Sequence, residues 1–321
     1  MNTVLQFNSM TEKKINWSET LLTGLTLFFT VVPFLTVILI LIQVLVQGLP
    51  AISWTFLSAA PRDGMMHGGI FPCIFGTVFV TLIMIVMALP MGIGAGIYLV
   101  EYAGQGPIVR VIRAAVNNLA GVPSIVFGLF GVGFFILFVG RSIDTVLKTG
   151  LLFGQPCMLW AAATLAVLVL PIIIVSTEEA LNAVPQSHRQ ASLALGATKW
   201  ETILNVVLPQ ARGGILTGAI LSISRGVGET APILFTGAAY FLPHLPAADL
   251  FGVIPMVNPA SQFMSLSYHI FVMATQSIDP VKTLPIQYGT TLVLIALTFL
   301  MNFTAIGFRI HFRRQQEKFS H

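Results

Sequence analysis

The chain has 321 residues, of which 55% are apolar and only 9% are charged. A soluble domain carries about 25% charged residues, so this chain has too little charge to cover the surface of a soluble fold. An ordinary soluble enzyme, a disordered regulator and a nucleic-acid binder are therefore excluded. The basic residues behind the net charge of +4 lie between apolar blocks and form no single patch. This pattern is typical of an all-α integral membrane protein.

Long runs without charged residues predict about six transmembrane helices. A helix needs about 20 residues to cross roughly 30 Å of hydrocarbon. Five uncharged runs are each long enough for one crossing, and a sixth apolar segment is interrupted by Arg225 and Glu229. The expected spans lie near residues 21–47, 70–100, 116–140, 156–176, 213–241 and 284–308.

The distribution of Lys and Arg predicts that both termini are cytoplasmic. Most of the 16 basic residues fall in the two tails and in the loops 101–115 and 177–212. Positive residues favour the cytoplasmic side, and an even number of spans brings both ends to that side. The expected organisation is a cytoplasmic tail (1–20), a first helix with an outer loop (21–68), a core (69–310) and a second cytoplasmic tail (311–321).

Several features receive structural interpretations. The chain has no P-loop and no Cys/His cluster, so it is expected to bind no nucleotide cofactor or metal itself.

Gly92 and Gly96 stand four apart in an apolar segment, which favours close helix packing. Cys73 and Cys157 are expected as buried thiols, with a disulfide as the alternative. The Pro-rich outer loop 242–283 is either a re-entrant segment lining a vestibule or a plain connection.

The inner loop 177–212 has the pattern of two short helices joined by a sharp turn. Two pairs have capping-box spacing: Ser187 with Gln190, and Thr198 with Glu201. Gly196 lies between them and can adopt a positive φ. The second helix is expected to end near Val207, before Pro209.

This hairpin is also amphipathic. A compact apolar knob on the cytoplasmic face suits a groove on another protein. The small and apolar residues expected to form it are Ala191, Leu193, Ala194, Leu195, Ile203, Val206 and Val207.

The same loop resembles the EAA loop of ABC-importer permeases, which docks on the ATPase subunits. The residues that carry the resemblance are Gln190, Ala191, Ser192, Gly196, Val206, Leu208 and Pro209. They match the family form EAA-x3-G-x9-I-x-L-P in spacing, although Gln190, Ser192 and Val206 replace its Glu, second Ala and Ile. The resemblance implies a coupling loop, with Gly196 as its hinge. The loop would move as the partner ATPase closes and would reorient the spans by rigid-body alternating access.

Arg225 and Glu229 are four residues apart in the fifth expected span, so they share one helix face. A charge deep in the bilayer costs about 2.5–3.5 kcal/mol on insertion scales, so the pair must face the bundle interior, a partner or water. Either the two side chains neutralise each other structurally, or Arg225 meets an anion in a transport path. Candidate hydroxyl donors on that path are Ser124, Ser222, Ser224 and Thr230, each with the alternative of bonding back to its own helix.

Segments on both sides of this pair resemble phosphate-specific ABC permeases. The matching segments are 69–77, 96–102, 121–131 and 222–232. The run from Glu229 to Thr236 is similar to the PstA type of subunit. The resemblance implies an importer of inorganic phosphate in the bacterial inner membrane. Its other implied parts are a PstC-type permease, two copies of an ABC ATPase that holds ATP-Mg, and a periplasmic phosphate-binding protein.

Phosphate suits the charged pair chemically. Arg225 offers a fork of donors to phosphate oxygens, and phosphate near neutral pH carries a proton that Glu229 could accept, whereas sulfate has none. The same residues are consistent with two alternative functions: an ion-coupled secondary anion transporter with Glu229 as proton relay, and an ABC permease for another oxyanion. A membrane enzyme is least favoured, because no paired carboxylates or nucleophile–base set lies at membrane depth.

Overall fold

Helices form nearly all regular structure in the residues that the computed structural model describes, which are 17–104, 106–250, 254–277 and 279–319. Within these residues, six helical segments are long and apolar enough to cross a membrane, which confirms the predicted fold class. They are Leu21–Ala51, Phe71–Tyr102, Ser124–Leu147, Met158–Asn182, Lys199–Gly228 and Pro280–Ile310. Residues 1–16 of the expected N-terminal tail, with Lys13 and Lys14, lie outside the described residues.

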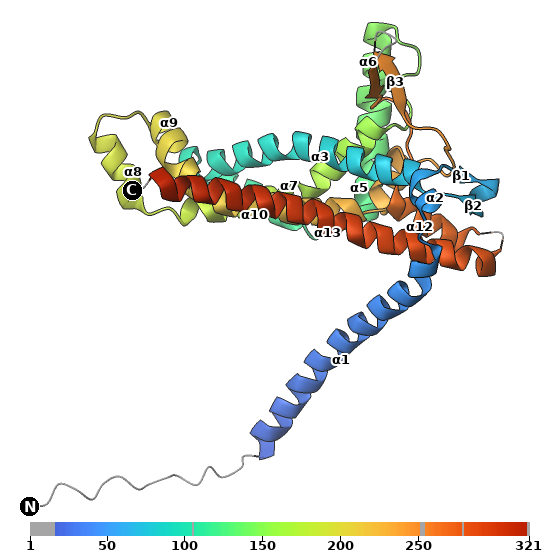
Figure 1. The fold of residues 1–321 in the computed structure, drawn as a ribbon. Coiled ribbons are helices and arrows are strands. Elements are labelled where there is room, and N and C mark those ends of the chain that lie inside the picture. Colours follow the sequence, from blue (N-terminus) through green and yellow to red (C-terminus); the bar gives the residue numbers. More distant parts are fainter. Residues whose placement is uncertain (1–16, 105, 251–253, 278, 320–321) are drawn as a thin grey trace, which may run out of the picture.

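The elements of the first half of the chain are shown in Figure 1. In order they are α1 (Trp17–Gly48), α2 (Trp54–Ser58), β1 (Pro61–Arg62), β2 (His67–Gly68), α3 (Phe71–Ile97) with a π-helical turn (Tyr98–Tyr102), α4 (Pro107–Leu119), α5 (Ser124–Phe130), a π-helical stretch (Gly131–Gly140) and α6 (Arg141–Leu147). The short strands β1 and β2 pair antiparallel. Two short 3₁₀ turns, Leu49–Ala51 and Asp63–Met65, complete this half.

The second half holds the inner hairpin and the last span. Its elements are α7 (Met158–Asn182), α8 (Gln186–Ala194), α9 (Lys199–Thr202) with a π-helical turn (Ile203–Val207), α10 (Leu208–Gly228), α11 (Ala231–Thr236), β3 (Ala247–Leu250), β4 (Ile254–Val257), α12 (Leu266–Thr275) and α13 (Pro280–Phe319). Strands β3 and β4 form an antiparallel hairpin. Helix α13 continues through residues 311–319, which the sequence places in the C-terminal tail.

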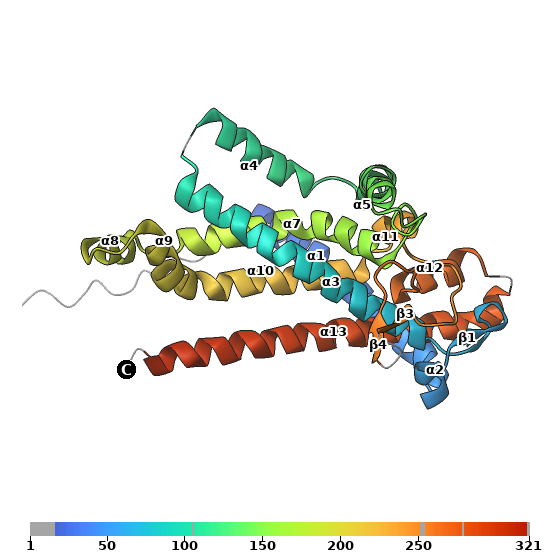
Figure 2. The same cartoon turned by 90° about the horizontal axis from the view of Figure 1, so that it is seen from above.

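The centre of the bundle is the packing of α7 against α3 and α10, which run side by side with it in Figures 1 and 2. Small residues make the close approach possible. A Cβ on Gly92 would lie 2.5 Å from Ile173, and one on Gly96 would lie 2.7 Å from Thr177. The predicted packing role of these two glycines is confirmed, because any side chain there would push α3 away from α7.

Two spans depart from this bundle. Helix α1 diverges from it in Figure 1, and its contacts lie at its C-terminal end against α13, where Gln43 Nε2 donates to Tyr288 Oη at 2.9 Å. The segment 124–147 stands across the direction of α3 and α7 and is seen end-on in Figure 2. Its α5 part packs on α11 and α7.

The third span begins later than the sequence predicts. Residues 116–119 belong to α4, and the span proper starts at Ser124, after the break at residues 120–123. Pro123 explains the boundary, since proline disfavours the helical conformation in the residue before it. The expected span 116–140 is therefore wrong at its start, and part of the expected loop 101–115 is helical.

The fifth span is displaced in the same way. It runs from Lys199 to Gly228 and stops there, so the expected range 213–241 is wrong at both ends. Glu229 is extended (φ −74°, ψ 131°), and α11 starts anew with Pro232 in its first turn, where a missing N–H costs nothing. The second hairpin helix also does not end before Pro209, because the π-helical turn ahead of it accommodates the proline.

The outer loop 242–283 is more than a plain connection. Its helix α12 packs between α3 and α13, and Thr77 Oγ1 accepts from the Leu266 N–H at 2.9 Å. Leu266 and Val272 are fully buried there. A vestibule lined by this loop stays a prediction. Cys73 and Cys157 are both free and buried, which confirms the expectation of two thiols.

Candidate functional site

The predicted charged pair lies where the fifth span breaks. Arg225 is in the last turn of α10, and its Nε lies 3.4 Å from Glu229 Oε1. The arginine side chain is 32% exposed and the glutamate side chain 19%. The break is held in place from α12, because Ser267 Oγ donates to the Glu229 carbonyl at 3.1 Å. Irregular backbone inside a membrane span is tolerated where protein buries it or a water-filled cavity borders it.

The pair is loosely bonded. Among the described residues, the Arg225 guanidinium makes this single long contact, so its two Nη groups keep their N–H donors. Glu229 Oε2 likewise has no hydrogen-bond partner within the described part of the chain. The arrangement can neutralise both charges and still offer donors to an anion.

Two of the four hydroxyls considered as path donors have other partners. Ser222 Oγ donates to Gly218 O at 2.8 Å. Ser224 Oγ lies 3.0 Å from Ile220 O and 2.9 Å from Asn302 Oδ1 of α13. Ser222 follows the back-bonded alternative, whereas Ser224 shares its hydroxyl between its own helix and α13, so its role on the path stays a prediction. Thr230 lies in the break before α11 and Ser124 opens α5, so their predicted role as donors stays open.

The turn of the inner hairpin is built as predicted. Gly196 has φ +86° and open space where a Cβ would stand. The capping box at Thr198 is confirmed, because Glu201 N donates to Thr198 Oγ1 and Glu201 Oε2 accepts from Thr198 N. The box expected at Ser187 is wrong: α8 starts at Gln186, directly after Pro185, and has no side-chain cap.

The apolar knob differs from the prediction on its second helix. Ile203 and Val207 are fully buried; Val207 packs into the bundle beside Leu181. The large apolar side chains that the hairpin exposes are Leu193, Leu195, Trp200 and Leu204. A helix that continues into the membrane must turn its apolar stripe toward α7, and this leaves other positions facing outward.

The remaining residues of the EAA-like pattern take different places. Gln190 and Ala191 are exposed on α8, and Ser192 Oγ lies 2.9 Å from Thr202 Oγ1 on the other arm of the hairpin. Leu208 and Pro209 are half-buried at the start of α10.

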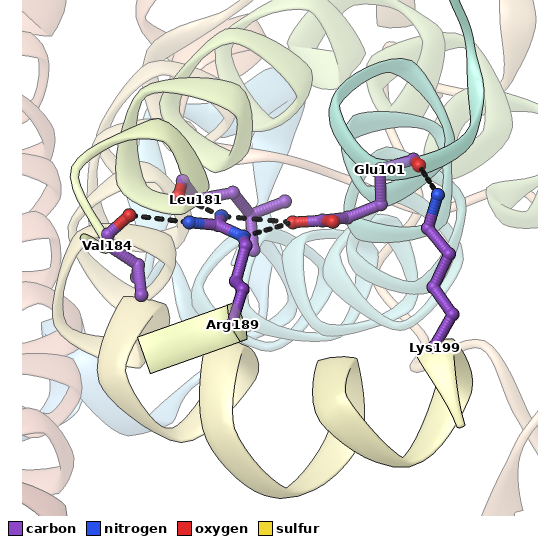
Figure 3. Close-up of polar contacts among 5 residues, drawn as sticks. All are labelled: Glu101, Leu181, Val184, Arg189 and Lys199. Carbon is purple, nitrogen blue, oxygen red and sulfur yellow. Dashed lines mark hydrogen bonds and ion pairs between the residues drawn. The ribbon is translucent and has the colours of Figure 1, made fainter. Parts of the chain in front are cut away.

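An anchor that sequence reasoning missed fixes the hairpin to the bundle (Figure 3). It consists of Glu101, Arg189 and Lys199, and we call it the hairpin anchor. Arg189 Nη2 and Nε lie 3.0 and 3.2 Å from Glu101 Oε1, and both side chains are only 10% exposed. The same guanidinium donates to the Leu181 carbonyl at 2.7 Å and the Val184 carbonyl at 2.5 Å.

The cations of the hairpin anchor lie at helix C-termini, where positive charge is stabilised. Lys199 Nζ donates to the Glu101 carbonyl and lies 4.8 Å from the centre of the Tyr102 ring. Glu101 belongs to the π-helical turn that ends the second span, and Leu181 to the last turn of α7. Carbonyls at helix C-termini lack intrahelical partners and carry partial negative charge, so cations are stabilised there. The signal in the sequence was an acidic residue at a span end and an arginine beside the EAA-like pattern.

Comparisons with known proteins show which family this chain belongs to. The family model described as "Binding-protein-dependent transport system inner membrane component" matches residues 88–317. The probable ABC transporter permease protein YqgI of Bacillus subtilis is 30% identical over 264 residues, which are 82% of this chain and 85% of that protein. Two proteins called phosphate transport system permease protein show similar identity. PstA 1 of Mycobacterium tuberculosis H37Rv is 38% identical over 65% of each chain, and PstA of Xylella fastidiosa 9a5c is 34% identical over 69% of this chain and 72% of its own.

Solved structures share the fold. A chain of a bacterial alginate ABC transporter superimposes with a TM-score of 0.60 at 12% identity, over 93% of this chain and 96% of its own. A chain of the inward-facing MetNI methionine ABC transporter gives a TM-score of 0.54 at 19% identity, over 75% of this chain and 94% of its own. At these identities the likeness concerns the fold alone.

Proposed function

The chain belongs to the family of inner membrane components of binding-protein-dependent transport systems, and from this premise we propose that it is a permease subunit of an ATP-driven importer of inorganic phosphate. It is a multi-pass inner membrane protein and a transport component rather than an enzyme, as its relatives are. Its family works with a separate ATPase and a substrate-binding protein.

The loosely bonded pair at the break of the fifth span carries the proposal. Arg225 keeps N–H donors beside Glu229 among the described residues, and a guanidinium binds phosphate oxygens through two parallel hydrogen bonds. The relatives called phosphate transport permeases support phosphate as the anion. Ser224 and Thr230 complete the proposed path. The Ser224 hydroxyl is held there by its hydrogen bond to Asn302 Oδ1.

The hairpin supplies the connection to ATP. Helix α9 continues through the π-helical turn into α10, so one helical stretch from Lys199 to Gly228 joins the exposed knob to Arg225. A stretch of this length spans roughly 45 Å. The partner ATPase holds ATP-Mg. When it closes under the knob, this helical stretch moves as a rigid body and changes the side of the membrane from which Arg225 and Glu229 can be reached.

The proposed assembly has a second permease of the PstC type, two copies of the ATPase and a periplasmic phosphate-binding protein. The proposed coupling loop is the predicted one, from Gln190, Ala191 and Ser192 through Gly196 to Leu208 and Pro209. The assignment of both termini to the cytoplasm remains part of the proposal.

Uptake of labelled phosphate tests the proposal. Vesicles would hold this chain, its permease partner and the ATPase, with binding protein outside, with or without ATP, and with excess sulfate as competitor. The expected result is uptake that requires ATP and resists sulfate. Uptake that ignores ATP and follows a proton gradient would indicate the secondary transporter, and uptake that sulfate blocks would indicate another oxyanion.

A further inference from the structure

We propose that Arg189 is a positioning residue that makes the second span follow the coupling hairpin, so that α3 moves together with α10 when the ATPase closes. The inference rests on the proposed function, and it assigns a role to residues outside the EAA-like pattern. The observation that carries it is the convergence of Arg189 and Lys199, both from the hairpin, on Glu101 at the end of α3 (Figure 3).

The chain itself connects the hairpin to two spans only. It enters from α7 and leaves through α9 into α10. Helix α3 is about 90 residues away in sequence, and its π-helical end touches the hairpin through side chains. Without these contacts, a push on the hairpin would reach α3 only through packing inside the bundle.

The contact is built to resist separation. Arg189 uses Nε and Nη2 on one carboxylate oxygen of Glu101 and directs Nη1 and Nη2 to the carbonyls of Val184 and Leu181. One buried guanidinium therefore joins α8, α3 and the end of α7. Because a planar fork holds several acceptors in fixed directions, the three elements keep their relative orientation.

A second arginine at the same helix end provides a comparison. Arg113 of α4 donates from Nη2 to the Leu99 carbonyl at 2.9 Å and pairs with Glu178 of α7 at 3.3 Å. It is 44% exposed and makes no contact with the hairpin among the described residues. Arg113 thus caps α3 without linking α3 to the hairpin.

The test measures phosphate taken up per ATP hydrolysed in vesicles with the complete complex. For Arg189→Gln we expect this ratio to fall about 10-fold, within the usual range of coupling between sites, while membrane insertion and assembly stay at the wild-type level. Glu101→Gln should lower the ratio in the same direction. The double variant should be no worse than Arg189→Gln alone, because Glu101→Gln weakens only a contact that Arg189→Gln has already removed. Arg189→Lys should recover part of the ratio, since it keeps the charge but not the fork.

The matched control is Arg113→Gln, which should leave the ratio within about twofold of wild type. An unchanged ratio in Arg189→Gln would overturn the proposal, as would an equal fall in Arg113→Gln or additive effects in the double variant. If Arg189→Gln fails to insert, the milder variant Glu101→Gln is used instead. Its ratio of phosphate taken up to ATP hydrolysed is then compared with that of Arg113→Gln, and an equal ratio would overturn the proposal. Failure of the proposed function is a separate result, because it would appear as absent ATP-dependent phosphate uptake in the wild-type complex.

Discussion

The inner hairpin and the break in the fifth span are both built around an Arg–Glu pair, but the two pairs are bonded very differently. At the hairpin, Arg189 and Glu101 are each 10% exposed, and the arginine has three acceptors within 3.2 Å. At the break, Arg225 is 32% exposed and has one contact at 3.4 Å within the described residues. A saturated guanidinium holds elements together, whereas an unsaturated one can take a further ligand.

This difference separates two tasks along one helical stretch. The end near Lys199 is fixed to the bundle and receives movement, and the end near Arg225 adjoins irregular backbone and can meet the transported anion. Changes at the hairpin should therefore alter the yield per ATP, and changes at the break should alter which anion passes and how fast.

Gly196→Val should have the largest effect and abolish ATP-dependent uptake while the protein still inserts. At φ +86° a β-branched residue is strained by about 1–2 kcal/mol or more. A turn that rearranges to relieve this strain would displace the knob from its binding site on the ATPase. Gly196→Asn is the matched control, because Asn tolerates this conformation and the site has room. Wild-type uptake in the Val variant would contradict the hinge assignment.

Arg225→Gln should lower phosphate uptake about 10- to 100-fold, the equivalent of one charged hydrogen bond of about 1.5–3 kcal/mol. Initial rates at saturating binding protein would measure it. The double variant Arg225→Gln with Glu229→Gln separates the two interpretations of the pair. Recovery in the double variant would show a self-neutralising structural pair, and continued loss would show an anion contact.

Glu229→Gln should have a smaller effect, seen in selectivity. If the carboxylate accepts a hydrogen bond from the P–OH group of phosphate, its loss should reduce the preference for phosphate over sulfate by roughly 5-fold, near 1 kcal/mol. Competition curves with a binding protein that accepts both anions would measure it. Unchanged discrimination would place selectivity outside this residue.

Thr198→Ala should have the smallest effect on transport, less than about twofold, although it removes a helix cap worth about 1 kcal/mol. The capping box closes the turn locally, while the hairpin anchor already fixes α9 through Lys199. Hydrogen exchange over residues 198–207 should speed up without a matching fall in uptake. A tenfold loss of uptake would mean that the cap, and not the anchor, holds the hairpin.

The sequence by itself predicts the parts that depend on local chemistry. Uncharged runs of the right length reveal six spans, Gly196 and Thr198 define the turn, and the short spacing of Arg225 and Glu229 brings their side chains within 3.4 Å of each other, although Glu229 lies just past the end of α10 and not on its face. These properties follow from residues a few positions apart, so a linear pattern is sufficient to find them.

Only the tertiary structure decided the rest. Hydropathy marks apolar residues but not where a helix stops, so it indicates neither the break at Glu229 nor the late start at Ser124. It also does not tell which apolar face the bundle covers, and for this reason the apolar pattern assigns the buried Ile203 and Val207 to the docking knob. The meeting of Glu101 with Arg189 joins residues 88 positions apart. Such a contact depends on how α3 and α7 pack through Gly92 and Gly96, because packing sets the distance between span ends that the chain does not connect.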